Sequence, residues 1–263
     1  DLDDKSLLRL FRLLPKELAA DTFAEMDPDL QEKLITGFTD KELSEVFEEM
    51  FLDDTVDVIE EMPASVVKRI LKNVDSDTRK SINQMLSYPE DSAGSIMTIE
   101  YVDLRPAMTV EEDFAHIREH GVDKETIYTC YVTEKDRTLI GMVSVKTLLL
   151  ADSDDILIKD IMLTNMIFVT TQTDQEDVAR MFSKYNFLAL PVVDGEGRMV
   201  GIVTFDDAMD VMEEEATEDM ELMSGMTPSE KPYLRSSAFE LFKNRIPWLM
   251  LMMVSATFTG LIM

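Results

Sequence analysis

An apolar residue followed by a turn or capping signal recurs every twelve positions through the first 88 residues. The recurring positions are Leu14, Met26, Phe38, Met50, Met62, Val74 and Leu86. Most of them precede a proline or a short polar side chain, such as Pro15, Pro63 or Asp75, and these residues begin helices rather than continue them. The spacing therefore predicts a string of short helices over residues 1–88, in which each unit buries its apolar face against its neighbours, as in a small superhelix.

The pattern changes after residue 88, where two stretches of about 60 residues repeat each other, beginning with Ile96-Met97 and with Ile161-Met162. Each stretch predicts a short β-rich run, an amphipathic helix, two strands and a closing helix. The ranges are 102–104, 110–120, 127–133, 139–145 and 145–151 in the first copy, and 167–169, 175–185, 189–193, 199–204 and 205–212 in the second. The predicted fold class is therefore α+β, with an all-helical region followed by a duplicated βαββα unit.

The last 18 residues, 246–263, carry no charge and follow Lys243 and Arg245. A helix of that length rises about 27 Å, which is close to the roughly 30 Å of a bilayer's hydrocarbon core. We therefore expect the start of a first transmembrane helix here, with the basic pair keeping everything upstream on the cytosolic side. Pro247 and three hydroxyl residues dilute the signal, so a buried terminal helix is the alternative.

The charge balance is strongly acidic, with 53 acidic against 25 basic residues and a net charge of -28. Such a field repels phosphate backbones, which argues against nucleic-acid binding, and it concentrates cations. Plain solubility would explain the composition equally well. The single cysteine, Cys130, allows no intrachain disulfide and fits a reducing compartment. No signal-peptide pattern opens the chain.

Carboxylates are densest from Asp206 to Glu221, where nine acids occur without a base. Four of these acids follow one another at steps of three, four and four residues, so they share one face of the predicted helix: Asp207, Asp210, Glu214 and Glu218. A second acidic group, Asp53-Asp54 with Asp57, lies in the helical region. Oxygen ligands without His or Cys suit Mg²⁺, Ca²⁺ or Mn²⁺. Neither group suffices alone, so we expect ions that bridge the two regions.

The duplicated units resemble a tandem pair of cystathionine-β-synthase (CBS) domains. The resemblance lies in Leu190-Pro191-Val192-Val193-Asp194 and in the paired signatures Gly141-Met142-Val143-Ser144 and Gly201-Ile202-Val203-Thr204. Together with the helical repeat, residues 91–98 and Glu215-Ala216-Thr217-Glu218-Asp219, the whole chain is similar to MgtE-type magnesium transporters. This resemblance implies a helical N domain (1–88), CBS domains at 89–153 and 154–214, a connecting "plug" helix region (215–245) and the start of the first transmembrane helix (246–263).

The resemblance also implies a ligand set for several regulatory Mg²⁺ ions. The matching positions are Asp53, Asp57, Asp207, Asp210, Glu215, Glu218 and Asp219, with a weaker match at Glu176 and Asp21. Asn186 stands where the family pattern can carry Asp, and its amide oxygen can ligate only without charge.

The function implied by the resemblance is closure of a magnesium pore when Mg²⁺ bridges the N and CBS domains. It further implies a homodimer formed through the CBS domains and a transmembrane domain beyond residue 263. The whole protein would then be multi-pass in the cell membrane, with this portion cytoplasmic.

Adenine nucleotides such as ATP are a second candidate ligand, because CBS pairs often grip ribose with Thr or Ser followed closely by Asp. Thr204 with Asp207 fits this pattern, whereas Ser144 has no such Asp and offers Lys146 to a phosphate. The alternative function is therefore a nucleotide-sensing CBS module tethered to a different membrane protein. An enzyme is not expected, because no activated nucleophile or phosphate-cradling glycine loop occurs. The string His116 to His120 spells H-x-x-E-H without an identifiable third ligand.

Overall fold

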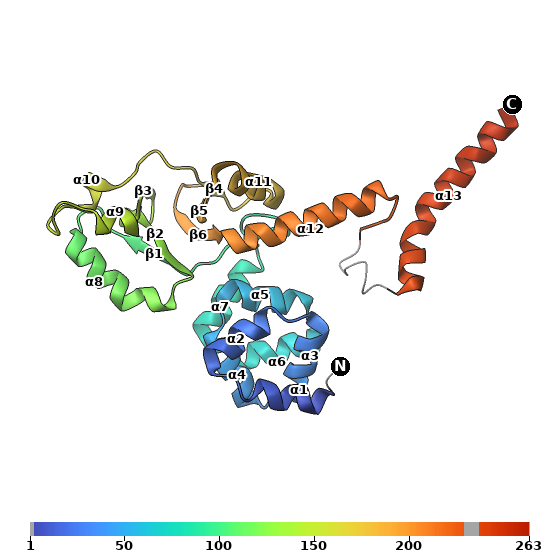
Figure 1. Cartoon of the computed structure of the whole chain (residues 1–263), viewed down its shortest axis with the longest axis horizontal. Helices are drawn as coiled ribbons and strands as arrows, with labels where there is room; N and C mark the ends of the chain where they lie inside the picture. The colour runs from blue at the N-terminus through green and yellow to red at the C-terminus, as the bar shows by residue number, and fades with distance from the viewer. Residues whose placement is uncertain (1–2, 229–236, 263) are drawn as a thin grey trace. The chain divides into compact units, whose positions relative to one another are not determined.

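The computed structural model describes residues 3–228 and 237–262, and the chain divides into two compact units, residues 1–205 and 206–263. The first unit holds a helical N domain and two three-stranded sheets (Figure 1). The second unit holds most of one long helix and a further helix. Each unit is described by itself below.

Seven helices form the described part of the N domain, which confirms the predicted string of short helices. They are α1 (Asp4–Phe11), α2 (Lys16–Ala24), α3 (Pro28–Gly37), α4 (Asp40–Glu49), α5 (Leu52–Glu61), α6 (Ala64–Asn73) and α7 (Ser76–Met85). Helices two apart in sequence pack together, α1 on α3, α3 on α5, α5 on α7, and likewise α2 on α4 and α4 on α6. This second-neighbour packing is how a short-period helical repeat buries its faces, and it confirms the superhelix.

The recurring apolar residues have one local role in the middle of this domain. Phe38, Met50, Met62 and Val74 each cap the C-terminus of a helix in extended backbone, and each side chain is buried in the common core. A ten-residue helix plus its cap and the following residue makes the period of twelve. Leu86 departs from the pattern, because its backbone is still helical and its side chain is 37% exposed. The repeat therefore ends where the chain enters the CBS region.

The first CBS domain contains β1 (Tyr101–Leu104), α8 (Val110–His120), the 3-10 turn η1 (Gly121–Asp123), β2 (Thr126–Thr133), β3 (Leu139–Ser144) and α9 (Val145–Leu149). The short α10 (Ile158–Ile161) follows. The second domain repeats this order with β4 (Val169–Thr170), α11 (Gln175–Tyr185), β5 (Ala189–Val193), β6 (Met199–Thr204) and α12 (Phe205–Met223). In each sheet the first two strands are parallel and the last two antiparallel. The duplicated βαββα unit is confirmed.

The last strand of each sheet also pairs with the segment that leads into the other sheet. Thr98, which precedes β1, pairs with Ile202 on β6, and Leu163, which precedes β4, pairs with Met142 on β3. A Cβ on Gly201 would lie 2.7 Å from the Met97 sulfur, and a Cβ on Gly141 would lie 2.7 Å from the Met162 sulfur. The two glycines are therefore required because each makes room for the methionine of the exchanged segment. The boundary between residues 153 and 154 stays a prediction, since the leading segments cross it in both directions.

The second unit contains the rest of α12 and α13 (Ala238–Ile262). The uncharged run from residue 246 is thus helical as far as Ile262, with Pro247 inside the helix. In the described part of the chain, no helix combines the length and the hydropathy needed to cross a bilayer. The start of a transmembrane helix at residue 246 stays a prediction. Of the predicted connecting region 215–245, residues 229–236 lie outside the described residues.

Candidate metal site

Three carboxylates from separate segments converge in the first unit. Asp53, Glu100 and Glu125 each place an oxygen within 4.8 Å of the other two. Asp53 lies in the first turn of α5 and is 8% exposed, whereas Glu100 and Glu125 are half-buried. We call this group the carboxylate triad. It brings an acid of the N domain against two acids of the first CBS domain.

The strand register explains why the two glutamates meet. Tyr101 on β1 pairs in parallel with Thr126 on β2, so the residues just before the two strands lie side by side. The Glu125 N–H donates to the Glu100 carbonyl at 2.9 Å, which fixes that juxtaposition. Parallel strands begin at the same edge of a sheet, and here both are preceded by an acid.

The Glu100 carboxylate also binds the N domain directly. Its Oε2 accepts a hydrogen bond from the Leu52 N–H at 3.1 Å. Leu52 is the first residue of α5, and the N-cap, Phe51, supplies no side-chain cap. Glu100 therefore satisfies one free N–H of the helix and places its negative charge at the positive end of the helix dipole. A helix-capping role accounts for Glu100 alone, but not for the approach of Asp53 and Glu125.

The donor chemistry of the triad fits Mg²⁺. Two unit charges about 5 Å apart repel by roughly 3 kcal/mol at an effective dielectric of 20, before other contacts and screening are counted. A divalent cation reverses the sign of that energy. Three carboxylates without His or Cys suit Mg²⁺, Ca²⁺ or Mn²⁺, and Mg²⁺ completes its shell with water. Asp53, Glu100 and Glu125 would therefore hold the ion.

The other sequence-predicted acids lie elsewhere. Asp57, one turn along α5, is exposed and does not belong to the triad. The predicted acids that follow the second CBS sheet all lie on α12, with Asp207 and Glu215 half-buried and the rest exposed: Asp207, Asp210, Glu215, Glu218 and Asp219. Helix formation through Met223 supports the predicted shared face. Their assignment as ligands stays a prediction.

Three weaker candidates have local roles in the structure. Asn186 ends α11 in left-handed backbone with φ of 54°, a conformation that asparagine tolerates better than most residues. Glu176 pairs with Arg180 on the same helix. Asp21 is exposed on α2. A ligand role for each of them also stays a prediction.

The sequence prediction missed Glu100 and Glu125. The signal was present, because an acid lies two residues before each of two predicted strands, 102–104 and 127–133. A βαβ connection makes such strands parallel neighbours, and their starting residues then meet. Acids at helical spacing do not reveal this pairing, because it joins two strands that are distant in the sequence.

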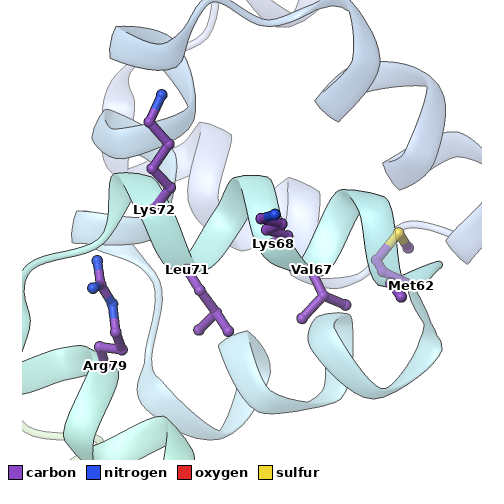
Figure 2. Close-up of a pocket in the computed structure, with 7 residues that line it drawn as sticks. Met62, Val67, Lys68, Leu71, Lys72 and Arg79 are labelled. Carbon is purple, nitrogen blue, oxygen red and sulfur yellow. The ribbon is translucent and has the colours of Figure 1, made fainter.

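An open groove of about 730 Å³ on the N domain has the opposite charge. Figure 2 shows Lys68 and Lys72 on α6 and Arg79 on α7, which line it together with the apolar Val67 and Leu71. None of the residues lining this groove is acidic. It is therefore excluded as a cation site.

The predicted nucleotide residues occupy equivalent positions in the two repeats. Ser144 and Thr204 end β3 and β6, and each is paired with the corresponding position of the preceding strand. The Ser144 hydroxyl accepts from the Thr147 N–H at 3.1 Å and so caps α9, whereas Thr204 is buried. Lys146 is exposed on α9. A nucleotide at Ser144 would have to share or replace this cap.

Comparison with known proteins agrees with this architecture. The MgtE intracellular N domain model matches residues 1–91, and the CBS domain model matches residues 158–214. The magnesium transporter MgtE of Thermus thermophilus is 38% identical over 255 residues, which cover 95% of this chain and 56% of that protein. The Bacillus subtilis transporter of the same name is 28% identical, over 99% of this chain and 57% of its own length. The chain thus spans just over half the length of these relatives.

Two solved structures share the fold. One is the cytosolic domain of the Mg²⁺ channel MgtE in complex with ATP, with a TM-score of 0.76 and 39% identity over 80% of this chain and 86% of that one. The other is the soluble part of a magnesium transporter, also with a TM-score of 0.76 and with 33% identity, over 82% and 84% of the two chains. The N domain, the CBS pair and these likenesses agree: the chain belongs to the MgtE family of magnesium transporters.

Proposed function

We propose that this chain is the Mg²⁺-sensing regulatory part of a magnesium transporter or channel, and that it favours the closed pore when Mg²⁺ is bound. The observation that supports the proposal best is the carboxylate triad, in which Asp53 of the N domain meets Glu100 and Glu125 of the first CBS domain. A sensor needs a site whose geometry differs between two states. A site shared by two domains meets that requirement, because it is complete only when they are together.

The charges of the triad supply the energy difference between the states. Without a divalent cation, Asp53 is repelled by both glutamates, which favours separation of the N domain from the CBS domain. With Mg²⁺ bound, the same carboxylates hold the domains together. Binding can shift the equilibrium only by the difference in affinity between the two states. Further ions on the acids of α12 would add to that difference, and Asp207, Asp210, Glu215, Glu218 and Asp219 are the candidates.

The test is Mg²⁺ titration calorimetry of the chain and four variants. Asp53→Asn, Glu100→Gln and Glu125→Gln each remove one charge from the triad, and each should weaken the tightest Mg²⁺ binding by about tenfold or more. Glu49→Gln is the matched control, because it removes an exposed acid that ends the preceding helix, α4, and that is not a predicted ligand. Thermal unfolding without Mg²⁺ separates loss of the ion from loss of the Glu100 cap on α5. Unchanged binding in both glutamate variants would refute the triad as the sensor.

Limited proteolysis provides a second readout in the same samples. If the triad closes the two domains on Mg²⁺, millimolar Mg²⁺ should protect the stretch 89–95 that joins them. Protection should be lost in Asp53→Asn and kept in Glu49→Gln. A cleavage rate that does not respond to Mg²⁺ would count against domain closure.

A second candidate function is nucleotide sensing, favoured by the equivalent positions of Ser144 and Thr204 and by the ATP complex of the relative described above. ATP would be gripped near the ends of β3 and β6, with Lys146 available to phosphate. Calorimetry with ATP distinguishes the functions. Tight ATP binding that Thr204→Val abolishes, together with no Mg²⁺ response, would favour the nucleotide sensor.

The assembly belongs to the proposal as well. By analogy with the relatives, the chain would form a homodimer through its CBS domains and would regulate a transmembrane domain of the same protein in the cell membrane. Light scattering of the chain tests the first part. A monomer at every concentration, with and without Mg²⁺, would contradict it.

A further inference from the structure

The first CBS domain buries an acid inside its core. Asp113 on α8 is 0% exposed, and neither oxygen of its carboxyl group has a hydrogen-bond partner among the described residues. Its surroundings are apolar, since Val110 and Ile117 of the same helix pack with β1, β2 and β3. A buried polar group without a partner is costly, and an ionised one is more so. A carboxyl group at such a place needs an explanation.

The second repeat shows what this position ordinarily holds. Helices α8 and α11 both have 11 residues, and both follow a capping side chain, Thr109 and Asp174. Counted from these caps, Asp113 corresponds to Val178, which is also 0% exposed. The same helix position therefore faces the core in both repeats. The first repeat carries a carboxyl group where the second carries an isopropyl group of similar size.

The groups around Asp113 do not neutralise it. Cys130 on β2 is buried beside it, and burial together with Asp113 raises the pKa of that thiol to about 12. On β1, Val102 and Leu104 pack in the same core cluster as α8 and carry no charge. Tyr101 packs edge-on against Tyr131 in a separate cluster, and Asp103 pairs with Arg105 at 3.1 Å. On α8 itself, His116 stacks on His120 and forms no ion pair with Asp113 among the described residues. Burial raises the pKa of Asp113 to about 7.

We propose that the buried carboxyl group of Asp113 is a proton-sensing element of the first CBS domain: protonated, it fills a core position as a neutral group, and ionised, it loosens α8 from the sheet. The second CBS domain has no such response, because Val178 cannot ionise. The signal is thus confined to one repeat of an otherwise matched pair.

The direction of the pH effect follows from linkage. The folded state keeps the proton at pH values where the unfolded chain has already released it, because the pKa is higher in the folded state. The stabilisation is complete below about pH 4, where both states are protonated. It is lost as the pH rises to about 7, and it changes little above that value. Raising the pH should therefore open α8.

Hydrogen exchange of the intact chain, followed by mass spectrometry from pH 5 to 8 and corrected for intrinsic rates, tests the proposal. The opening equilibrium of α8 should rise by about tenfold per pH unit up to about pH 7 and then level off. The opening of α11 should stay flat. In Asp113→Asn, which keeps the shape without the titration, the slope of α8 should disappear.

Two further variants keep the test decisive. Asp113→Val copies the second repeat and should also abolish the slope, so it serves if the asparagine variant does not fold. Glu111→Gln removes an exposed acid of the same helix and should leave the slope unchanged. A flat α8 profile in the unmodified chain, or a slope that survives in Asp113→Val, would overturn the proposal.

Discussion

In the first CBS domain α8 buries Asp113 against the sheet, and in the second α11 buries Val178 at the corresponding position. The closing helices differ as well, since α9 has 5 residues and α12 has 19. Strand order, strand direction and the exchanged leading segments are nevertheless the same in both repeats. The shared features therefore specify the fold, whereas the differences are where the two repeats can acquire separate roles.

The largest loss of stability should come from giving the second repeat the buried carboxyl group of the first. Val178→Asp places an unpaired carboxylate in the second core and should cost about 3–5 kcal/mol at pH 8. Hydrogen exchange of α11 measures this loss. Ser183→Asp, an exposed position on the same helix, should cost less than about 0.5 kcal/mol. Equal effects of the two changes would show that position 178 is not a core position.

The paired glycines should respond unequally. A Cβ on Gly201 would lie 2.6 Å from the Thr98 carbonyl oxygen, which is backbone, whereas Gly141 meets chiefly the flexible Met162 side chain. We expect Gly201→Ala to cost about 2–3 kcal/mol and Gly141→Ala about 1–2 kcal/mol, measured by denaturant unfolding. Gly195→Ala, with nothing within 4 Å, is the neutral control. The reverse order would mean that the two segment exchanges are not equivalent.

Removal of a helix cap should cost less stability than substitution of Gly201. Thr109 and Glu112 form a reciprocal capping box on α8, whereas Asp174 caps α11 by accepting from the Glu176 N–H. Thr109→Ala and Asp174→Ala should each cost about 1 kcal/mol in thermal unfolding. Because Thr109 and Glu112 act as one unit, the double alanine variant should cost less than the sum of the single ones. Strict additivity would indicate that the box is not formed.

The smallest effect should come from Asn186, the C-cap of α11. The corresponding C-cap of α8 is Gly121. Asn186→Gly should change stability by less than about 0.5 kcal/mol, because glycine adopts left-handed backbone freely. Mg²⁺ calorimetry on the same variant decides between its two roles. Unchanged affinity would leave Asn186 as a helix-ending residue, and weaker binding would support its predicted role as a ligand.

The sequence predicted those parts of the fold that depend on local periodicity. Phe38 and Met50 recur because each helix must end with an apolar cap directed into the core, and this rule acts within a dozen residues. The two βαββα repeats could also be predicted, because their helices and strands follow local periodicity. The pairing of Thr98 with Ile202 was not, because nothing near either residue specifies a partner so distant in the chain.

The candidate site divides in the same way. Asp53 was predicted from its own helix, but Glu100 and Glu125 required the register of two parallel strands. The sequence does not distinguish Asp113, because it is one of three consecutive acids at the start of a helix. Only the direction in which α8 faces the sheet separates it from the exposed Glu111 and Glu112.

The exchanged leading segments also constrain how this protein is made. Thr98 leaves the ribosome about a hundred residues before Ile202, so its partner strand does not yet exist when the first repeat emerges. Met142 on β3 likewise has no partner until Leu163 has been synthesised. Neither repeat can reach its final form alone, and a duplication or transfer of one without the other would leave an incomplete sheet. The two repeats together are therefore the smallest part of this fold that can be duplicated or transferred with a complete sheet.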